Sequence, residues 1–592
     1  MDKRIAAAET MERAAPKIAE EPQILSGRAR SLNLQVTPAV ILLIAILGAL
    51  VLPPVYLLIK TSFYTTAADG SFGVFTFEYY EALFSSKTLM GDLLNSLMFA
   101  AGSALFALIL GAGQAWIVER TDTPLRQYIF LISIISLGLP HVLYTSAWLL
   151  TLGKSGPFNG LLMWASGADS VVFDVYTMTG MIIIEGMIWT PLAFLLLSST
   201  FRNFDSSFEE AALMSGAGTA ATFRRITLPL ALPAVLALLL LVFIRAFEAF
   251  DIPALVGGAG DVTVLTTEVY NSIRKELPAN YGQAGAFSTV LMLAVILLLV
   301  LQKSLLSHAD RFQTITGKGF RPRVISLGPW RYLTSSILVL LFVVLLVVPL
   351  GMIIIVSLAP YYDGVNLALF QRASLANYAI IADSPSLRQA VLNTIILGVA
   401  SATFVCALTA GGAWLAARKA KGAWIIDQLA TVPLIFPAIV LSVAFLQLFL
   451  NSPILLYGTL TSLVIAATMQ YLPYGMRFNF AGALQIHREL EEAAAAAGAS
   501  RASIFLRIVL PLLLPTIITS WLFVLLLSVR AVALPILLAG PNSQVVAVVL
   551  FDLWGNGQVS EMAAFGVVWS IFMMCIGGVL YYLSRRNGVS VH

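Results

Sequence analysis

Two short acidic strings are the first residues of this chain whose types and spacing could carry a function. Glu209-Glu210-Ala211-Ala212 precedes Gly216, and Glu491-Glu492-Ala493-Ala494 precedes Gly498 at the same spacing. No nucleophile elbow and no His/Asp metal cluster accompanies them, so neither string predicts catalysis. The Ala- and Glu-rich residues favour helix and the glycine permits a sharp turn. Each string therefore predicts a surface element that a partner protein can contact and move.

Both strings continue in the same way. Arg225-Ile226-Thr227-Leu228-Pro229 matches Arg507-Ile508-Val509-Leu510-Pro511, and the offset between matched positions is constant throughout both strings. The segment Arg501 to Leu510 predicts a short amphipathic helix with Ile504, Phe505 and Ile508 on one face. Proline is tolerated in the first turn of the helix that follows. We expect a helix–turn–helix that is rigidly joined to the next apolar segment.

Charged residues inside apolar segments form the second candidate group. They are Glu185, Arg245, Glu248, Asp251 and Arg530. Charges within a bilayer are costly and face a protein interior or water. They could line a translocation cavity, or they could be interhelical ion pairs, for example Arg245 with Glu248 or Asp251. The spacing i to i+3 allows the Arg245–Glu248 pair directly.

The elements that position these residues must lie in a membrane. The chain has 592 residues, of which 59% are hydrophobic and 11% charged, whereas soluble domains carry about 25% charged residues. Apolar runs near the spanning length of about 20 residues recur from Val40 to Leu583. Two cysteines, Cys406 and Cys575, and four scattered histidines indicate neither a disulfide framework nor a metal site. The composition predicts an all-α polytopic membrane protein without a metal or other cofactor.

We expect about twelve transmembrane helices. The predicted spans are 39–61, 92–117, 126–151, 175–200, 230–252, 284–305, 334–358, 389–417, 425–450, 458–484, 512–534 and 562–584. With the N-terminus inside, about three quarters of the 35 Lys and Arg residues fall in cytoplasmic segments. This bias predicts cytoplasmic N- and C-termini, and it places both acidic strings in the cytoplasm.

The repeat divides the chain into two six-span halves. Asn95-Ser96 and Trp116 recur as Asn393-Thr394 and Trp414, at an offset that is slightly larger than that of the acidic strings. Pro140 recurs as Pro437, and Pro191 recurs as Pro473. An even number of spans per half makes the halves parallel repeats. The expected domains are a cytoplasmic tail (1–35), a first six-span domain (36–305), a cytoplasmic linker (306–333), a second six-span domain (334–586) and a C-terminal tail (587–592).

The duplicated pattern Glu-Ala-Ala, three residues, Gly, nine residues, Ile-x-Leu-Pro resembles the signature of permease subunits of ATP-binding-cassette importers. The resemblance covers the chain after about residue 36. It implies two fused permeases of the type I importer fold (MetI-like) in a bacterial inner membrane. In that family this loop forms a coupling helix that docks in a cleft of the ATPase subunit. By resemblance, Glu210 and Glu492 would meet basic groups of the ATPase, and Gly216 and Gly498 would form the turn.

The resemblance also implies the partners and the full set of coupling residues. Two copies of a separate ATPase subunit and an external substrate-binding protein are expected, because the chain has no G-x-x-x-x-G-K-[ST] loop of its own. The implied coupling residues are Glu209, Glu210, Ala211, Ala212, Gly216, Ile226, Leu228, Pro229, Glu491, Glu492, Ala493, Ala494, Gly498, Ile508, Leu510 and Pro511. Gly218 in the first copy stands where the second has Ser500, so the first loop could be looser.

The substrate stays open at this stage. The phrases at residues 153–160 and 453–460 resemble fused permeases of the ferric-iron group, and permeases for 2-aminoethylphosphonate look very similar; thiamine and polyamine permeases are more distant. Ferric iron is the favoured substrate and 2-aminoethylphosphonate the alternative. The rival classes are a major-facilitator secondary transporter, whose loop signature is missing after the second span, and a membrane-embedded enzyme, for which no catalytic cluster is visible.

Overall fold

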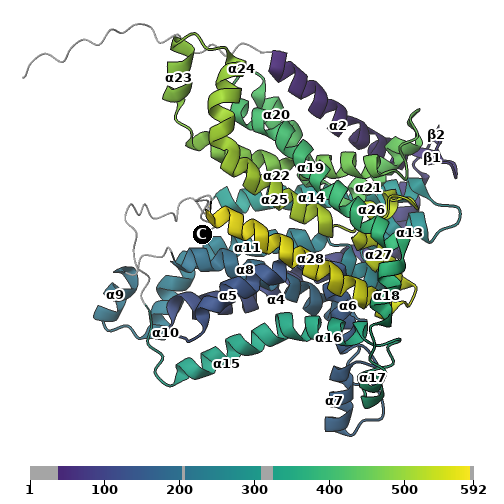
Figure 1. Ribbon diagram of the computed structural model, residues 1–592, viewed down its shortest axis with the longest axis vertical. Helices are drawn as coiled ribbons and strands as arrows, with labels where there is room; N and C mark the ends of the chain where they lie inside the picture. The colour runs from purple at the N-terminus through teal and green to yellow at the C-terminus, as the bar shows by residue number, and fades with distance from the viewer. Residues whose placement is uncertain (1–37, 203–206, 308–323, 587–592) are drawn as a thin grey trace, which may run out of the picture.

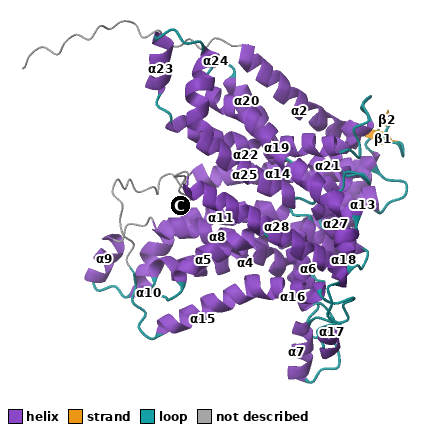
Figure 2. Ribbon diagram, in the orientation of Figure 1, coloured by secondary structure: helices purple, strands orange, loops and turns teal. Residues whose placement is uncertain are grey.

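The computed structural model describes residues 38–202, 207–307 and 324–586, and these are helical almost throughout (Figure 2). In this part of the chain the strands are β1 (Tyr64–Thr66) and β2 (Phe72–Phe75), which pair as an antiparallel hairpin. The all-α fold predicted from composition is confirmed.

The helices follow the repeat. The first half contains α2 (Pro38–Phe63), α3 (Glu78–Ser85), α4 (Lys87–Arg120), α5 (Arg126–Leu137), α6 (His141–Leu152), α7 (Pro157–Ser166), α8 (Met178–Arg202), α9 (Ser207–Met214), α10 (Thr219–Thr222), α11 (Leu228–Phe247), α12 (Asp251–Leu255), α13 (Leu265–Arg274) and α14 (Tyr281–Ser307). The second half contains α15 (Trp330–Phe342), α16 (Val348–Ser357), α17 (Leu367–Gln371), α18 (Ala376–Asp383), α19 (Pro385–Ala417), α20 (Ala423–Thr431), α21 (Ala438–Leu450), α22 (Leu460–Gln485), α23 (Arg488–Ala496), α24 (Arg501–Ile504), α25 (Leu510–Arg530), α26 (Pro535–Leu538), α27 (Val546–Gly555) and α28 (Val559–Arg586). All twelve predicted spans coincide with helices of these two sets.

Two of the predicted spans are broken. By length and composition, 8 helices of the described chain could cross a membrane, or up to 10 if each bent pair counts as one span. The bent pairs are α5 with α6, at 102°, and α20 with α21, at 108°. The breaks fall at the matched prolines Pro140 and Pro437, whose ψ angles of 134° and 147° are extended. Proline has no N–H and its ring clashes with the preceding turn, so the helix stops and restarts in a new direction.

The other two predicted spans miss this count for separate reasons. Helix α22 is 26 residues long but carries the polar side chains of Gln470, Arg477 and Asn479. Helix α28 is described with its side chains only as far as Cys575. The predicted number of about twelve spans therefore exceeds the 8 to 10 that length and composition support.

The first helix of each half packs on the other half. Helix α2 contacts α14 of its own half and also packs on α20 and α21 of the second half, with Val40 buried beside Gly422 (Figure 1). Helix α15 returns to the first half, where the Thr334 and Thr123 hydroxyls lie 2.7 Å apart and the Ser335 hydroxyl donates to the Pro124 carbonyl. The two halves are therefore joined by reciprocal packing as well as by the linker.

Each half is built on a close crossing of two long helices, α4 with α8 and α19 with α22. Gly111 of α4 packs directly on the backbone of α8 at Ala193. At the repeat-equivalent crossing the small residue is on the other helix, because Gly475 of α22 faces Thr409 of α19. Small residues let membrane helices approach closely. The glycine of this crossing therefore lies on the first long helix, α4, in the first half and on the second long helix, α22, in the second half.

The loops separate onto two faces. Helices α9, α10, α23 and α24 lie on one side of the bundle, and the hairpin, α7, α13, α17 and α27 lie on the other (Figure 1). This division matches the alternation of predicted inner and outer loops. The acidic strings therefore share one face.

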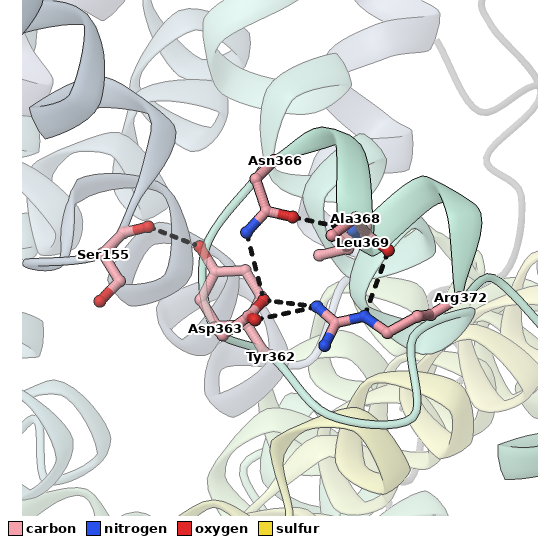
Figure 3. Close-up of polar contacts among 7 residues, drawn as sticks. All are labelled: Ser155, Tyr362, Asp363, Asn366, Ala368, Leu369 and Arg372. Atoms are coloured by element: carbon pink, nitrogen blue, oxygen red, sulfur yellow. Dashed lines mark hydrogen bonds and ion pairs between the residues drawn. The ribbon is translucent and has the colours of Figure 1, made fainter.

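On the opposite face a loop of the second half is pinned to the first half. The Tyr362 hydroxyl donates to the carbonyls of Leu150 and Ser155 at 3.1 and 3.2 Å. Arg372 forms two hydrogen bonds of 2.9 Å to the Asp363 carboxylate, and Asn366 caps α17 (Figure 3). The guanidinium of Arg372 holds the pKa of Asp363 below its ordinary value. Burial raises the pKa of Tyr362 to about 12, so its hydroxyl stays protonated and can donate.

Candidate functional site

The two acidic strings fold into the same element. In each copy a short helix, α9 or α23, ends at a glycine, and a second short helix, α10 or α24, leads towards the following span. Gly216 and Gly498 both have φ of +85°. A side chain at this left-handed φ is strained, although nothing within 4 Å would meet an added Cβ at either position. Glycine is thus favoured by the backbone and not by crowding.

The hydrogen bonds around the glycines explain this conformation. The Ala217 amide donates to the Ala212 carbonyl and the Ala499 amide donates to the Ala494 carbonyl, each at 3.0 Å. These are the bonds of a helix C-cap in which the chain reverses through a left-handed residue and satisfies the last carbonyls. The same bonds at matched positions give two elements of equal backbone geometry.

A π-helical turn joins each element to its span. The turns are Phe223–Thr227 and Phe505–Val509, which occupy matched positions of the repeat. Each one stands directly before a helix with proline in its first turn, Pro229 of α11 or Pro511 of α25. A proline cannot donate the usual backbone bond, and a widened turn accommodates its ring. The Ile226 and Ile508 side chains are half-buried there, Leu228 is exposed, and Leu510 is half-buried.

The adjacent acids of the second copy have opposite surroundings. Glu491 is buried and accepts hydrogen bonds from Arg418 at 2.7 and 2.9 Å and from the Trp414 indole at 3.2 Å. Arg418 also donates to the Ile486 carbonyl at 2.8 Å. Its side chain is 8% exposed and that of Glu491 is 7% exposed. We call Trp414, Arg418 and Glu491 the α23 clamp, because they hold α23 against the end of α19.

Glu492 points away from this clamp. Its side chain is exposed, as is that of Glu210 at the matched position of the first copy. Ala493 and Ala211 are exposed, whereas Ala494 and Ala212 are partly covered. The Glu209 side chain lies outside the described part of the structure. In the second copy, one acid of the pair therefore serves the fold and the other faces solvent.

The copies differ at the start of the second short helix. Ser500 caps α24 by accepting from the Ser503 amide. Gly218 has no side chain to cap α10 in this way, and its carbonyl accepts hydrogen bonds from the Thr222 amide and hydroxyl. The first copy thus lacks one side-chain bond of the second.

The intramembrane charges form one ion pair and one mixed cluster. Arg245 pairs with Glu248 at 3.1 Å, as the i to i+3 spacing allows. Glu185 is buried and accepts from the Trp189 indole at 2.7 Å. A second contact joins Asp251 to His141, 3.6 Å from Nδ1.

Arg530 reaches across from the second half. Its Nη1 donates to the Leu137 carbonyl at 2.7 Å, at the end of α5 where the span is broken. A small pocket lies here in the first half, and Arg530 is the lining residue that reaches it from the second half. Its walls include Ser136, His141, Trp189 and Arg530. No group of three or more His, Cys, Asp or Glu side chains that could hold a metal ion is found among the described residues.

The sequence alone did not identify four of these partners. Arg418 and Trp414 were missed as partners of Glu491, although Trp116 and Trp414 recur at matched positions. His141 was missed as a neighbour of Asp251, because the two meet only after the break at Pro140 turns α6 towards α12. Trp189 was missed as the partner of Glu185, although the two lie four positions apart on α8. The repeat could have indicated Trp414, since a residue that is the same at matched positions of both halves suggests a structural role that the halves share.

A family model described as "Binding-protein-dependent transport system inner membrane component" matches residues 104–311 and 404–588. The chain is 24% identical over 486 residues to the ferric transport system permease protein FbpB of Actinobacillus pleuropneumoniae, covering 81% of this chain and 69% of that protein. A putative ferric permease, FbpB 1 of Haemophilus influenzae, is 26% identical over 72% of this chain and 66% of its own length.

A relative named for a different substrate matches less than half of the chain. The putative 2-aminoethylphosphonate permease PhnU of Salmonella choleraesuis is 29% identical over 42% of this chain and 85% of its own length. Among solved structures, a bacterial ABC transporter that imports alginate aligns with 20% identity and a TM-score of 0.35, covering 41% of this chain and 85% of that one.

The family model matches twice, once in each half, and the matches together cover more than half of the chain. Each match contains one of the two acidic strings and the helices that carry it. The chain is thus a transport component and not an enzyme. It belongs to the binding-protein-dependent transport system inner membrane components, as a multi-pass permease with two fused copies of the family domain.

Proposed function

We propose that this permease imports ferric iron, driven by two ATPase subunits that dock on its two acidic elements. The observation that carries the mechanism is the equal geometry of those elements, with φ of +85° at both glycines and an exposed glutamate at both matched positions. The iron assignment rests on the two ferric permease relatives, at 24% and 26% identity.

We assign contact with the ATPases to the exposed residues of the two acidic strings. Glu210 and Glu492 contact basic side chains of the ATPases, one subunit for each half. The alanines beside them and the turns at Gly216 and Gly498 shape the docking surface. The residues from Ile226 to Pro229 and from Ile508 to Pro511 transmit movement into α11 and α25, because each docking element continues into its span without a flexible loop.

The orientation is part of the same proposal. The face with α9, α10, α23 and α24 is cytoplasmic, together with both termini and the linker at 306–333. In this proposal the two permease domains comprise residues 36–305 and 334–586, and α2 and α15 pack across the boundary between them. On the opposite face a substrate-binding protein delivers the substrate, as the family description implies.

The transport cycle uses a path at the contact between the halves, where Arg530 of the second half meets the Leu137 carbonyl of the first. When two ATPases close on ATP, the two acidic elements (α9 with α10, and α23 with α24) move towards each other. The two halves then rotate so that the path opens to the binding protein. ATP hydrolysis resets it towards the cytoplasm. Glu185, Asp251 and Arg530 lie on this path, and Arg245 and Glu248 act as a pair at its edge.

A reconstituted complex in proteoliposomes tests the substrate. ATP hydrolysis should rise when the binding protein is loaded with ferric iron. The alternative substrate is 2-aminoethylphosphonate, which is favoured by the relative that matches one half at 29% identity. A rise with the phosphonate and none with iron would overturn the iron assignment and keep the importer mechanism. No rise with either would overturn both substrates.

A further inference from the structure

Helix α7 has an apolar face that the rest of the described chain leaves largely uncovered. Phe158, Leu161 and Trp164 are spaced three positions apart, so they share one side of the helix. All three side chains are exposed, and that of Trp164 is 82% exposed. The α7 sequence contains no charged residue. Exposed apolar patches of this kind mark contact with another protein or with a membrane.

Asn159, on the other side of α7, fixes the helix in place. Its Nδ2 lies 2.9, 3.0 and 2.8 Å from the carbonyl oxygens of Leu152, Gly153 and Phe173. Its Oδ1 accepts from the Phe173 amide at 2.9 Å, and the whole residue is buried. The ring of Phe158 also packs edge-on against that of Phe173, with centroids 5.9 Å apart. The apolar face is therefore held in one orientation.

Helix α17 of the second half adds to this face. Leu367 and Phe370 are three positions apart in α17 and exposed, and α17 also lacks a charged residue. The Tyr362 hydroxyl, before α17, donates to the Ser155 carbonyl, before α7, at 3.2 Å (Figure 3). Loops from both halves thus bring apolar residues to one corner of the molecule. We call this set the outer platform: Phe158, Leu161, Trp164, Leu367 and Phe370.

The outer platform adjoins a span at the edge of the bundle. The segment Trp330–Ser357 is the most apolar of the candidate spans, and only 33% of its apolar stretch is buried inside the protein. Ile354 is exposed near the end of this segment, and Tyr361 is exposed in the loop that follows. Exposed apolar side chains therefore continue from the lipid-facing side of α16 into the loop that carries α17.

Helix α7 runs across the direction of the spans. The segment His141–Ser166, which includes α6 and α7, is bent by 102° from the end of α5. Figure 1 shows α7 pointing away from the bundle below α16, across the direction of α15. A helix in this direction lies parallel to a bilayer surface. Interfacial helices of this kind bury their apolar face, and tryptophan is enriched at that level of the membrane.

The second half closes the matched loop without such a helix. Residues 451–459 join α21 to α22, whereas the longer loop 153–177 joins α6 to α8 and contains α7. The added helix projects beyond the edge of the bundle, where a bilayer surrounds the protein (Figure 1). A binding protein that feeds a path at the contact between the halves would sit over the centre. The position of α7 therefore favours lipid as its partner.

We propose that the outer platform binds the surface of the lipid bilayer, on the side opposite the two acidic elements. Its apolar side chains lie among the lipid headgroups and the first carbons of the acyl chains. This contact anchors the joint at which Tyr362 of the second half meets Ser155 of the first. The inference depends on neither the substrate nor the ATPase assignment of the proposed function.

Spin labels on the full chain test this contact. The chain carries C406S and C575S, so that each added cysteine is the single labelling site, and it is reconstituted at one copy per nanodisc in phosphatidylethanolamine and phosphatidylglycerol. W164C places a label in the outer platform. S166C places one on the opposite side of the same helix, and N556C places one after α27; Ser166 and Asn556 are exposed.

Collisions with oxygen, which concentrates in the bilayer, are compared with collisions with a water-soluble nickel chelate. We expect the W164C label to meet oxygen in preference to the chelate, at a depth of about 5–10 Å. The N556C label should show the opposite preference, and the S166C label should lie nearer to water than the W164C label. L367C tests the platform from the other half and should agree with W164C.

Equal access of the nickel chelate to the W164C and N556C labels overturns the proposal, and so does an L367C label that is open to water. A W164C label that is open to the chelate until the substrate-binding protein is added also overturns it, and assigns the platform to that protein. A second copy of the chain cannot cover the platform, because each disc holds one copy. Loss of transport with either substrate leaves these label measurements unchanged, so the two proposals fail separately.

Discussion

The α23 clamp gives the sharpest prediction, because two adjacent glutamates should respond in opposite ways to the same substitution. Glu491 is buried against Arg418 and Trp414, whereas Glu492 is exposed. Removing one partner of a buried ion pair costs about 3–5 kcal/mol, because the other charge is left unpaired. R418M should cost this much of the local stability of α23. E491Q keeps hydrogen-bonding atoms and should cost about 1.5–3 kcal/mol.

The matched control is E492Q, which should change stability by no more than about 0.5 kcal/mol, as expected for an exposed site. A second control removes both charges. R418M combined with E491L should be closer to the unmodified chain than R418M alone, since an apolar replacement of a buried pair is often neutral.

Hydrogen exchange followed by mass spectrometry measures this directly on the full chain in nanodiscs. A loss of about 3 kcal/mol corresponds to faster amide exchange by about 100-fold or more. The increase should be confined to peptides from α23 and the turn at Gly498, with the middle of α22 as the internal reference. Unchanged exchange of α23 in R418M, or equal effects of E491Q and E492Q, would refute the assignment of the clamp.

Three further predictions concern the backbone and the outer loop. G498A should destabilise the docking element by about 1–2 kcal/mol because φ is +85°, whereas G555A, at an open glycine without positive φ, should not lower the melting temperature; equal effects would contradict the backbone argument. S500A should cost about 1 kcal/mol of cap energy, seen as faster exchange in α24, and an unchanged rate would show that the cap is not needed. The pKa of Asp363 is lowered by Arg372. The stability that this ion pair gives to the loop is therefore present above the ordinary pKa of about 3.9 and is lost as the pH falls below it. Amide exchange in the loop at 359–375 should rise only under acid conditions, and D363N should remove this dependence on pH.

Much of this architecture follows from spacing in the sequence. The constant offset of the repeat predicted that the two acidic strings occupy equivalent places, and Gly216 and Gly498 share one backbone conformation. The possible pairing of Arg245 with Glu248 followed from their separation by three positions, which lie on one face of a helix. Such features depend on local geometry, and local geometry can be read from the order of residues.

Features that depend on long-range packing could not be predicted in the same way. Pro140 lies in an apolar run that reads as one span, and many membrane helices accommodate proline without breaking. The chain turns by 102° at this proline, and α6 then packs on α8, α12 and α16. The opposite surroundings of Glu491 and Glu492 also require the position of α19, which no pattern around the two acids contains. Exchange of α2 and α15 between the halves is equally invisible in hydropathy.

The Arg530 contact shows the same limit at the candidate site. Its sequence position marked it as an intramembrane charge, but its neighbours come from the broken span of the other half, 393 positions away. From the sequence, the mixed-sign cluster could be interhelical ion pairs or could line a translocation cavity. In the structure Arg245 is paired with Glu248, and Arg530 lies in the wall of a pocket.

The most direct measurement of the central claim is ATP-driven uptake by proteoliposomes in which both exposed acids are reversed, E210K with E492K. We expect uptake to be lost while the chain is still inserted at its normal level, because both ATPase docking surfaces then repel their basic partners. The control E489K reverses another exposed acid of α23 and should transport normally. Unchanged uptake in the double reversal would contradict the account that the two acidic elements couple ATP hydrolysis to transport.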